Sequence, residues 1–459
     1  MWDRSGVSGS GCCQKVCRTD GRSGDDGIRG RLLRLAAPII GQSLLGTLMF
    51  FVDAAMLGRL RDPAALGAMA ITAPLLWMLM VVAVGFATGG FALVARAAGA
   101  GDRQSAAQAA AVSLRLCVLS GAAVALLTTF LLDHILAWMG AKGVVATYAR
   151  AYLLIVFAVF PVAYAAQSAT SSLRAAGHST PPFIAGILAN AVNIFLNAVL
   201  VFGLLGAPRL GVVGAAFGTA AAQTLYFALT LLFLRRRLGL RAHHSRAIHL
   251  VKPILRVSAP ALLNPAVNNT GYLVFTSFVV GLGAVSLAAH RVAISLESLS
   301  FMPGSAVGVA AGSLAGQALG AGDTKRAYLV TSEAMFVTAL IMSVAGLLYA
   351  ACPQLLARII TNQKAVIDAA TPVLRVAALA QPAFGITIVL VGTLNGAGAT
   401  TLAFLCQTFG MWAVRLPLAY LLTPYGLTAL WAVMIVHFGL EAILAYCLYR
   451  SGVWIKERL

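Results

Sequence analysis

Long apolar runs alternate with short polar segments along most of the chain, from Leu32 to Tyr449. An α-helix rises 1.5 Å per residue, so about 20 apolar residues are enough to cross the hydrocarbon core of a bilayer. The runs predict twelve membrane-spanning helices, at about residues 33–57, 66–95, 106–131, 147–172, 181–204, 211–234, 253–280, 285–315, 327–351, 367–393, 400–422 and 427–449. We therefore expect an all-α polytopic membrane protein.

An internal repeat divides the predicted helices into two equal sets. The tetrapeptide GAGD at Gly99–Asp102 occurs again at Gly320–Asp323, and the same spacing of 221 residues relates Pro161 to Pro382. Each half then holds six helices, and an even number leaves both halves in the same orientation in the membrane. The predicted fold class is twelve transmembrane helices in two six-helix lobes related by a parallel internal repeat.

The repeat also sets the predicted domain boundaries. They are a disordered N-terminal tail at 1–28, an N-lobe at 29–234, a basic cytoplasmic linker at 235–252, a C-lobe at 253–450 and a cytoplasmic C-terminal tail at 451–459. The N-terminal tail is polar and rich in Gly and Ser, which is typical of disordered segments. Its cysteines, Cys12, Cys13 and Cys17, have no second ligand pair at a zinc-like spacing, so we predict no metal site.

Composition and charge agree with a membrane protein. The sequence is 60% hydrophobic and 10% charged, whereas soluble domains carry about 25% charged residues. The formal net charge is +19, and most of the 33 Lys and Arg residues fall on one side of the membrane if the N-terminus is cytoplasmic. This bias follows the positive-inside rule. We expect a multi-pass protein of the cell membrane with both termini in the cytoplasm, and the positive charge does not indicate a nucleic-acid partner.

One carboxylate, Asp53, lies deep in the first predicted helix. A lone acid at the centre of a membrane helix costs about 2.5–3.5 kcal/mol, so such residues usually face a wet cavity and function there. The corresponding position in the second half, near Val274 or Phe275, is apolar. A scaffold role should be present in both halves, whereas a chemical role need not be. We therefore predict that Asp53 exchanges protons.

Three asparagines share one face of the fifth predicted helix. Asn190, Asn193 and Asn197 are separated by steps of three and four residues, which is the spacing of one helix face. Counted along each helix from its cytoplasmic end, Asp53 and Asn193 both lie in the central to outer part of the membrane, so one pocket can contain them. The alternative role of these amides is hydrogen bonding that holds helices together.

The predicted helices contain a second deep acid and further polar side chains. Glu297 in the eighth helix is either a second proton or cation site or the partner of a buried arginine such as Arg415 or Arg291. Arg291 is six positions away and lies on another face, so a partner on a different helix is expected. Three more candidates for the cavity wall, with helix packing as the alternative for each, are Gln167, Tyr164 and Gln381.

Several segments, taken in order, resemble one known family. They are FVDAAMLGRL in the first predicted helix, LVARAAGAGD ending the second, SSLRAAGHSTPP, ANAVNIFLNAVLVFG and GVVGAAFGTAAAQ in the fourth to sixth, and GTLNGAGAT ending the tenth. With their spacing in the two halves, these segments resemble the multidrug and toxic compound extrusion (MATE) family of secondary transporters. The resemblance covers about residues 30–450.

The resemblance implies an antiporter that exports amphipathic, often cationic compounds through a cleft between two lobes, against a proton or sodium gradient. Asp53 matches the first-helix aspartate that is the protonation site of proton-coupled members. Sodium-coupled members tend to carry acids in the seventh and tenth helices, where this sequence has Asn268 or Asn269 and the neighbourhood of Phe384. The resemblance therefore implies the DinF-like, proton-coupled branch, with Asn268 among the cavity residues.

Other functions have less support in the sequence. A sodium-coupled drug antiporter and a flippase for lipids or lipid-linked precursors remain alternatives within the wider superfamily. An enzyme is not expected, because HExxH, GxxxxGK and a Ser/His/Asp set are absent and His178 and His437 are isolated in the sequence. No re-entrant filter segment indicates a channel. We expect coupling to H⁺, no cofactor, small amphipathic or cationic substrates, contact with membrane lipid and a monomer.

Overall fold

The computed structural model describes residues 24–60, 62–241 and 247–455, which form helices joined by short turns and contain no β-strand. The first half holds α2 (Gly24–Gly58), α3 (Pro63–Gly99), α4 (Arg103–Phe130), α5 (Leu132–Trp138), α6 (Gly143–Ala158), α7 (Phe160–Ala175), α8 (Thr180–Phe202) and α9 (Val212–Leu238). The second half holds α10 (Val251–Val280), α11 (Ala284–Gly320), α12 (Thr324–Ala351), α13 (Pro353–Ile360), α14 (Lys364–Ala397), α15 (Thr400–Thr408), the π-helix η4 (Phe409–Arg415), α16 (Leu416–Leu422) and α17 (Leu427–Ser451).

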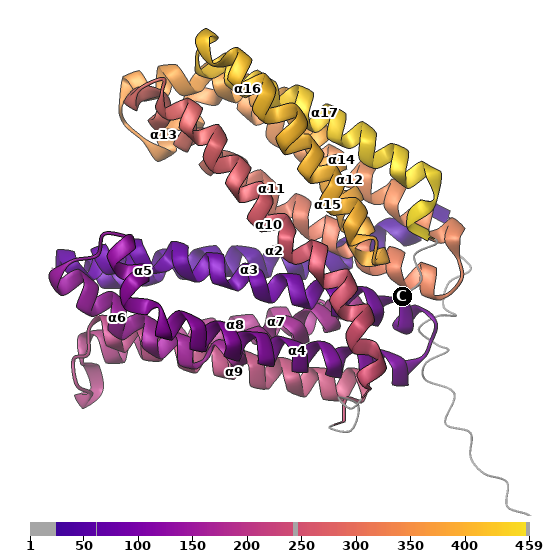
Figure 1. Ribbon diagram of the computed structural model, residues 1–459, viewed down its shortest axis with the longest axis horizontal. Coiled ribbons are helices and arrows are strands. Elements are labelled where there is room, and N and C mark those ends of the chain that lie inside the picture. The colour runs from indigo at the N-terminus through magenta and orange to yellow at the C-terminus, as the bar shows by residue number, and fades with distance from the viewer. Residues whose placement is uncertain (1–23, 61, 242–246, 456–459) are drawn as a thin grey trace, which may run out of the picture.

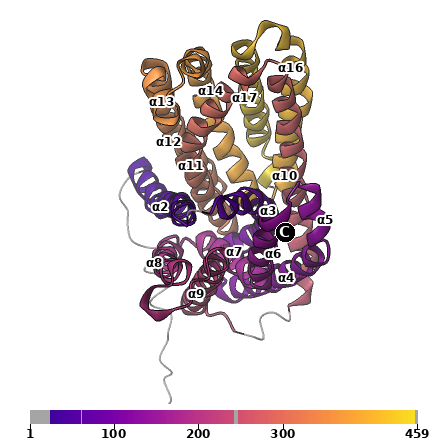
Figure 2. The same cartoon turned by 90° about the vertical axis from the view of Figure 1, so that its left-hand side faces the viewer.

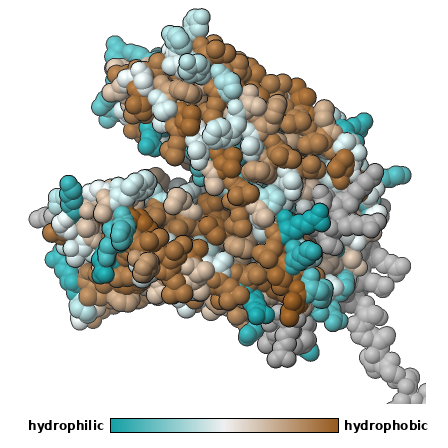
Figure 3. All heavy atoms as spheres, viewed as in Figure 1, coloured by the Kyte–Doolittle hydropathy of each residue, from teal (hydrophilic) through white to brown (hydrophobic). Residues whose placement is uncertain are grey.

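The helices form two lobes arranged as a V (Figure 1). Helices α2–α9 make the N-lobe and α10–α17 make the C-lobe, and a view turned by 90° shows one lobe stacked on the other (Figure 2). The lobes meet at the end that holds the C-terminus and diverge toward α5, α13 and α16, where a deep cleft separates them (Figure 3). The predicted all-α fold in two lobes is confirmed.

The described residues contain 10 helices that are long and apolar enough to cross a membrane, and an eleventh if the bent pair α6–α7 is one span. The remaining predicted span is α10. Its 30 residues exceed the length needed, but Asn264, Asn268 and Asn269 in its central part, with Pro260 and Pro265, lower its hydropathy. The outer surface of both lobes is largely hydrophobic in the view of Figure 3, as contact with lipid requires.

A bend at Pro161 distinguishes the two halves. The α6–α7 pair changes direction by 53° at a break at Val159, two residues before this proline, because proline lacks a backbone N–H and its ring clashes with the preceding turn. Its repeat partner, Pro382, lies inside the continuous helix α14. The bend therefore belongs to the N-lobe alone.

The chain ends differ in part from the predicted tails. Helix α2 begins at Gly24, so residues 24–28 are helical, while 1–23 lie outside the described residues. At the other end, Trp454 is buried, donates from Nε1 to the Tyr449 carbonyl at 2.8 Å and stacks on the Tyr449 ring. The first part of the predicted C-terminal tail is thus packed on the C-lobe. Of the predicted linker, residues 235–238 end α9 and 242–246 lie outside the description.

The repeated GAGD tetrapeptide lies where the lobes meet. Its aspartates cap the helices that follow: Asp102 accepts from the Ser105 N–H at 2.9 Å, and Asp323 accepts from the Arg326 N–H at 2.9 Å. Its first glycines allow contact between the lobes. A Cβ at Gly99 would lie 1.8 Å from the carbonyl oxygen of Gln317, and a Cβ at Gly320 would lie 1.9 Å from that of Arg96. Backbones of α3 and α11 therefore touch where these helices end.

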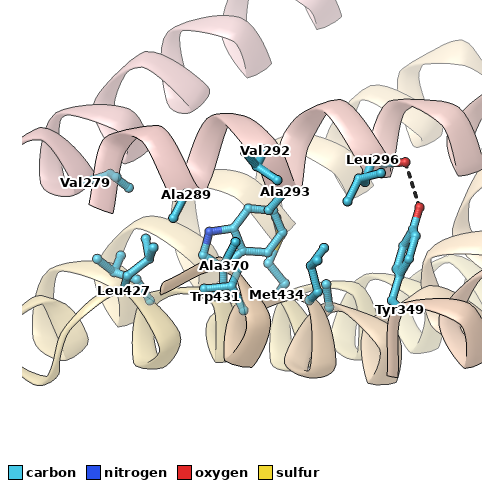
Figure 4. Close-up of a cluster of buried hydrophobic side chains, with 14 of the residues drawn as sticks. Val279, Ala289, Val292, Ala293, Leu296, Tyr349, Ala370, Leu427, Trp431 and Met434 are labelled. Carbon is cyan, nitrogen blue, oxygen red and sulfur yellow. Dashed lines mark hydrogen bonds between the residues drawn. The ribbon is translucent and has the colours of Figure 1, made fainter. Parts of the chain in front are cut away.

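Each lobe has its own apolar core. In the C-lobe, the buried Trp431 and Met434 of α17 pack against α11, and the Tyr349 hydroxyl donates to the Leu296 carbonyl at 2.7 Å (Figure 4). A comparable cluster around Phe157 fills the N-lobe between α3, α6 and α7. Two further clusters join the lobes, one around Ile254 and Val257 of α10 and one around Leu32 and Ala36 of α2.

Helix α2 connects the two lobes. Near its start, Leu32 and Ala36 are buried against α11, α12 and α14 of the C-lobe, and Arg29 forms an ion pair with Glu333 of α12. Further along, the same helix carries Asp53 into the N-lobe. A change at Asp53 is therefore linked mechanically to the C-lobe through a single continuous helix.

Candidate functional site

A cavity of about 410 Å³ lies inside the N-lobe between α2, α3, α7, α8 and α9. Four of the predicted site residues, Asp53, Gln167, Asn190 and Asn193, line it. The other lining residues are Gln42, Leu45, Gly46, Met49, Met80, Ala163, Ala166, Gly186, Ala189, Thr219, Ala222, Gln223 and Tyr226. The cavity combines one carboxylate with neutral polar groups and apolar wall, a composition that suits an amphipathic ligand.

Asp53 is held by an asparagine of α8. The Asn197 Nδ2 donates to Asp53 Oδ1 at 2.7 Å and to Asn193 Oδ1 at 2.8 Å. With the oxygen and nitrogen of the Asn193 amide exchanged, its nitrogen lies 3.3 Å from Asp53 Oδ1 and its oxygen accepts from the Thr219 N–H at 3.3 Å. Either orientation keeps α2, α8 and the acid in one hydrogen-bonded network. The i, i+4 pair Asn193–Asn197 thus fixes the carboxylate in position.

A glycine of α9 makes room for this network. Gly218 faces Asn197, and a Cβ added at Gly218 would lie 1.9 Å from Asn197 Oδ1. Real Cβ atoms do not approach this closely, so any larger residue must displace the amide. Nothing in the sequence of α9 singles out Gly218 from its other small residues.

If Asp53 is the proton-exchanging residue that the sequence predicts, Gly218→Ala should slow transport by about tenfold to hundredfold, since losing a hydrogen bond to a charged group costs about 1.5–3 kcal/mol. Asn197→Ala should cause a similar loss. The double variant should be no slower than either single variant, because both changes remove the same contact with Asp53. Initial rates in proteoliposomes measure this, and additive losses would show that Gly218 acts independently of Asn197.

Part of the cavity wall is formed by a hydrogen-bonded group that sequence reasoning missed. Arg174 Nη2 donates to Gln42 Oε1 at 2.7 Å, and Gln42 Nε2 donates to the Tyr226 hydroxyl at 2.6 Å. Thr170 shares the same hydroxyl at 2.7 Å. These residues come from α2, α7 and α9 and are far apart in the sequence. They join the three helices on the side of Asp53 nearer the start of α2.

Two of the predicted cavity residues belong to helix packing instead. Tyr164 is fully buried and donates to the Leu79 carbonyl at 2.5 Å. Gln381 is 1% exposed in the C-lobe and accepts from Ser300 Oγ at 3.2 Å. Neither residue lines the N-lobe cavity. The prediction that they line the cavity was wrong, because each points into the core of its own lobe.

The predicted C-lobe residues form a separate polar region. Asn268 donates to Asn264, which donates to Gln407 of α15, so the amides hold α10 to α15. Glu297 is half-buried, and the buried arginine that acts on it electrostatically is Arg415. Arg415 lies under the rings of Tyr272 and Phe275, 4.8 and 4.2 Å from their centroids. Among the ion pairs of the described residues, none joins Arg415 to Glu297.

His437 is isolated in the sequence but not in space. Its Nε2 lies 3.1 Å from Glu441 Oε2, and its Nδ1 lies 2.8 Å from the Gly410 carbonyl of the π-helix. A carbonyl only accepts, so Nδ1 carries a proton, and the contact with Glu441 needs one more proton on either partner. Sequence reasoning overlooked Glu441, although its i, i+4 spacing from His437 is a visible signal. No group of three or more His, Cys, Asp or Glu side chains in the described chain is placed to hold a metal ion.

A known protein family matches this chain twice, once in each lobe. A family model described as MatE matches residues 38–199 and again residues 260–421. The chain is similar to a probable multidrug resistance protein NorM of Thermotoga maritima, 29% identical over 443 residues that cover 94% of each chain. It is also similar to the multidrug resistance protein PmpM of Pseudomonas aeruginosa, 26% identical over 92% of this chain and 91% of the relative.

Solved structures share the fold. The MATE transporter VcmN of Vibrio cholerae in its bent form superposes with a TM-score of 0.88 at 20% identity, over 94% of this chain and 98% of that one. A structure described as the outward-facing conformation of a multidrug resistance MATE family transporter gives a TM-score of 0.85 at 21% identity, over 95% and 98% of the two chains.

Proposed function

This chain belongs to the MatE family of multi-pass membrane proteins, and we propose that it is a secondary active transporter that exports amphipathic, cationic compounds in exchange for protons. The observation that carries the proposal is the position of Asp53: it is the one carboxylate among the residues that line the N-lobe cavity. The relatives named as multidrug resistance proteins support an efflux role.

The proposed cycle uses one carboxylate for two ligands. As a carboxylate, Asp53 attracts a cationic substrate into the cavity, where Met49 and Met80 offer adaptable apolar contact. When a proton binds, the neutral acid no longer attracts the cation, and the substrate leaves. Asp53 thus holds a proton or a substrate, which couples their movements in opposite directions.

Helix α2 transmits this change in the proposed cycle. Protonation removes the charge that Asn197 stabilises through its 2.7 Å hydrogen bond, and α2 is then free to repack against α8. Because the start of α2 is buried against the C-lobe, repacking around Asp53 shifts the balance between the two lobe arrangements. One elementary charge moved across 100 mV supplies about 2.3 kcal/mol to drive the cycle.

The conformation described here corresponds to the outward-open state of this cycle. The cleft opens at the end opposite to the C-terminus, and the positive-inside bias assigns the C-terminus to the cytoplasm. The cytoplasmic end is closed by the contact of α3 with α11. Two complete lobes form the cleft within one chain, so we propose that a monomer is sufficient for transport.

The coupling ion is proposed to be H⁺, as in the DinF-like branch. Hard cations are bound in proteins by several oxygen ligands, usually including a carboxylate. The C-lobe amides Asn264 and Asn268 instead satisfy one another, and Glu297 stands near the positive charge of Arg415. This arrangement favours neither the sodium-coupled alternative nor a cation site in the C-lobe.

The test is transport by purified protein in sodium-free proteoliposomes with an acidic lumen. We expect a cationic fluorescent dye to accumulate in the lumen while the luminal pH rises, and added sodium to change neither signal. Collapse of the pH gradient with a protonophore should release the dye. A requirement for sodium would refute proton coupling, and movement of a labelled lipid without movement of the dye would favour the flippase.

A further inference from the structure

Two further cavities continue from Asp53 toward the outer end of the N-lobe. The inner one, of about 10 Å³, is lined by Asp53, Thr72, Tyr152 and Thr219 together with the apolar residues Leu57, Ala68, Met69, Val212 and Ala215. The outer one, of about 240 Å³, is lined by Leu60, Asp62, Ala65, Tyr148, Arg209, Leu210, Gly211, Val212 and Val213. The substrate cavity shares Asp53 and Thr219 with the inner cavity, and the inner and outer cavities share Val212.

The inner and outer cavities share walls from α3, α6 and α9; α2 contributes Asp53 and Leu57 to the inner cavity, whereas the segments that follow α2 and precede α9 complete the outer one. On α6, Tyr152 lines the inner cavity and Tyr148 lines the outer one. On α3, Ala68 lines the inner cavity and Ala65 lines the outer one. Residues three or four positions apart lie one above the other on a helix face, one turn or about 5.4 Å apart. The line of cavities therefore advances by one helical turn.

The inner cavity suits a single water molecule. Its volume is about that of one water-sized probe, which is the minimum that holds a water. The Asp53 carboxylate and the hydroxyls of Tyr152 and Thr219 surround it. Tyr152 is close enough to Asp53 and to Thr219 to interact with each of them. A water here has the two to four polar partners that a buried water needs.

A short apolar constriction separates this cavity from the outer one. Leu57, Ala65, Val212 and Ala215 are each buried and pack together as one cluster. The constriction is about one helical turn thick and contains small side chains. Hydrophobic constrictions of this kind control passage by excluding or admitting water.

The outer cavity carries three polar side chains and reaches the surface. Arg209 is exposed, Asp62 is partly exposed, and Tyr148 is close enough to Asp62 to interact with its carboxylate. On the proposed topology this mouth faces the outside of the cell, where the protons enter. Among the described residues that line the two cavities, the charged ones are Asp62 and Arg209 at the mouth and Asp53 at the inner end.

We propose that protons reach Asp53 along this line, from the mouth at Asp62, past the constriction at Val212, to the inner cavity. The proposal rests on the proposed function, in which Asp53 is the proton site. In the final step a hydronium or a protonated water chain gives one proton to the Asp53 carboxylate, which becomes a neutral acid and leaves a water molecule. Protons then approach Asp53 from the side opposite to the substrate, so a bound substrate does not block its own displacement.

Two substitutions at Val212 test the line in opposite directions. Val212→Phe fills the constriction and should slow proton-driven export by about tenfold. Val212→Thr keeps the shape but admits water, and it should speed export severalfold when external protons are scarce. The matched controls are Val433→Phe and Val433→Thr, because Val433 is the repeat-related, buried residue of α17 in the C-lobe. The control variants should leave the proton dependence unchanged.

A second readout separates slow proton access from damaged structure. A narrower path changes rates but not equilibria, so dye binding to Val212→Phe and its pH dependence should match those of the natural protein. Lower external pH should restore its export rate. The proposal is overturned if both Val212 variants export at the natural rate, or if acid fails to rescue Val212→Phe while dye binding is normal. If Asp53→Asn keeps proton-driven export, the proposed function itself fails.

Discussion

Replacing Asp53 by Asn should reduce proton-driven dye accumulation to the level of empty vesicles while leaving the protein folded. The amide has the shape of the carboxyl group and can still accept the hydrogen bond that Asn197 donates at 2.7 Å. It cannot bind or release a proton near neutral pH. No other carboxylate lines the N-lobe cavity to replace it. The variant therefore loses the exchange of a proton for a substrate without losing the network around it.

Proteoliposomes with an acidic lumen measure this effect through dye accumulation and the accompanying rise in luminal pH. Asp133→Asn is a suitable control, because Asp133 is an exposed acid of the same lobe whose pair with Arg150 contributes little to stability. We expect the control to transport normally. Dye concentrated by Asp53→Asn against its gradient would place the coupling site elsewhere, with Glu297 and the His437–Glu441 pair next to be tested.

Replacing Gly99 or Gly320 by Val should shift the protein away from the proposed outward-open conformation. The two glycines bring the backbones of α3 and α11 together, and a Cβ at either position would lie within 1.9 Å of a carbonyl oxygen across the lobe interface. Overpacking typically costs about 1–3 kcal/mol. Because only the closed cytoplasmic end has this contact in the proposed cycle, the ratio of outward-open to inward-open protein should fall by about tenfold or more.

Spin labels on Trp138 of α5 and Leu355 of α13 report this shift, since both side chains are exposed at the diverging ends of the lobes. The distance between the labels should shorten in both glycine variants. Gly439→Val is the control, because a Cβ at Gly439 meets no atom within 4 Å. Unchanged distances in Gly99→Val and Gly320→Val would show that this contact does not set the balance between the conformations.

The fold could be predicted from the sequence because each membrane helix must pair its backbone polar groups within itself. Backbone polar groups cannot remain unpaired in lipid, so every apolar run of sufficient length becomes a helix. The one predicted span of the described residues that falls short in composition is α10, where three asparagines and two prolines lower the hydropathy of a long helix. Its apolar run at about residues 253–280 was nevertheless long enough to predict the helix.

The candidate site could be predicted only in part. Asp53 and the α8 asparagines were identified because polar groups at membrane depth are costly and their spacing fixes a helix face. Tyr164 and Gln381 satisfy the same sequence criteria, yet each is buried in its own lobe. Gln42 and Tyr226 went unnoticed, although they form part of the cavity wall. Depth in the membrane is readable from a sequence, but the direction in which a side chain points depends on the neighbours of its helix.

By itself, the sequence determined the helices, the two repeated halves, the bias of positive charge and the single acid of the first helix. These features follow from local costs, namely the transfer of each residue into lipid and the length of each run. Only the tertiary structure decided which faces meet: Gly218 against Asn197, Gly99 against Gln317, and the line of cavities that ends at Asp53. These contacts depend on close packing between helices far apart in the chain. The free energy of transferring each residue into lipid does not specify them.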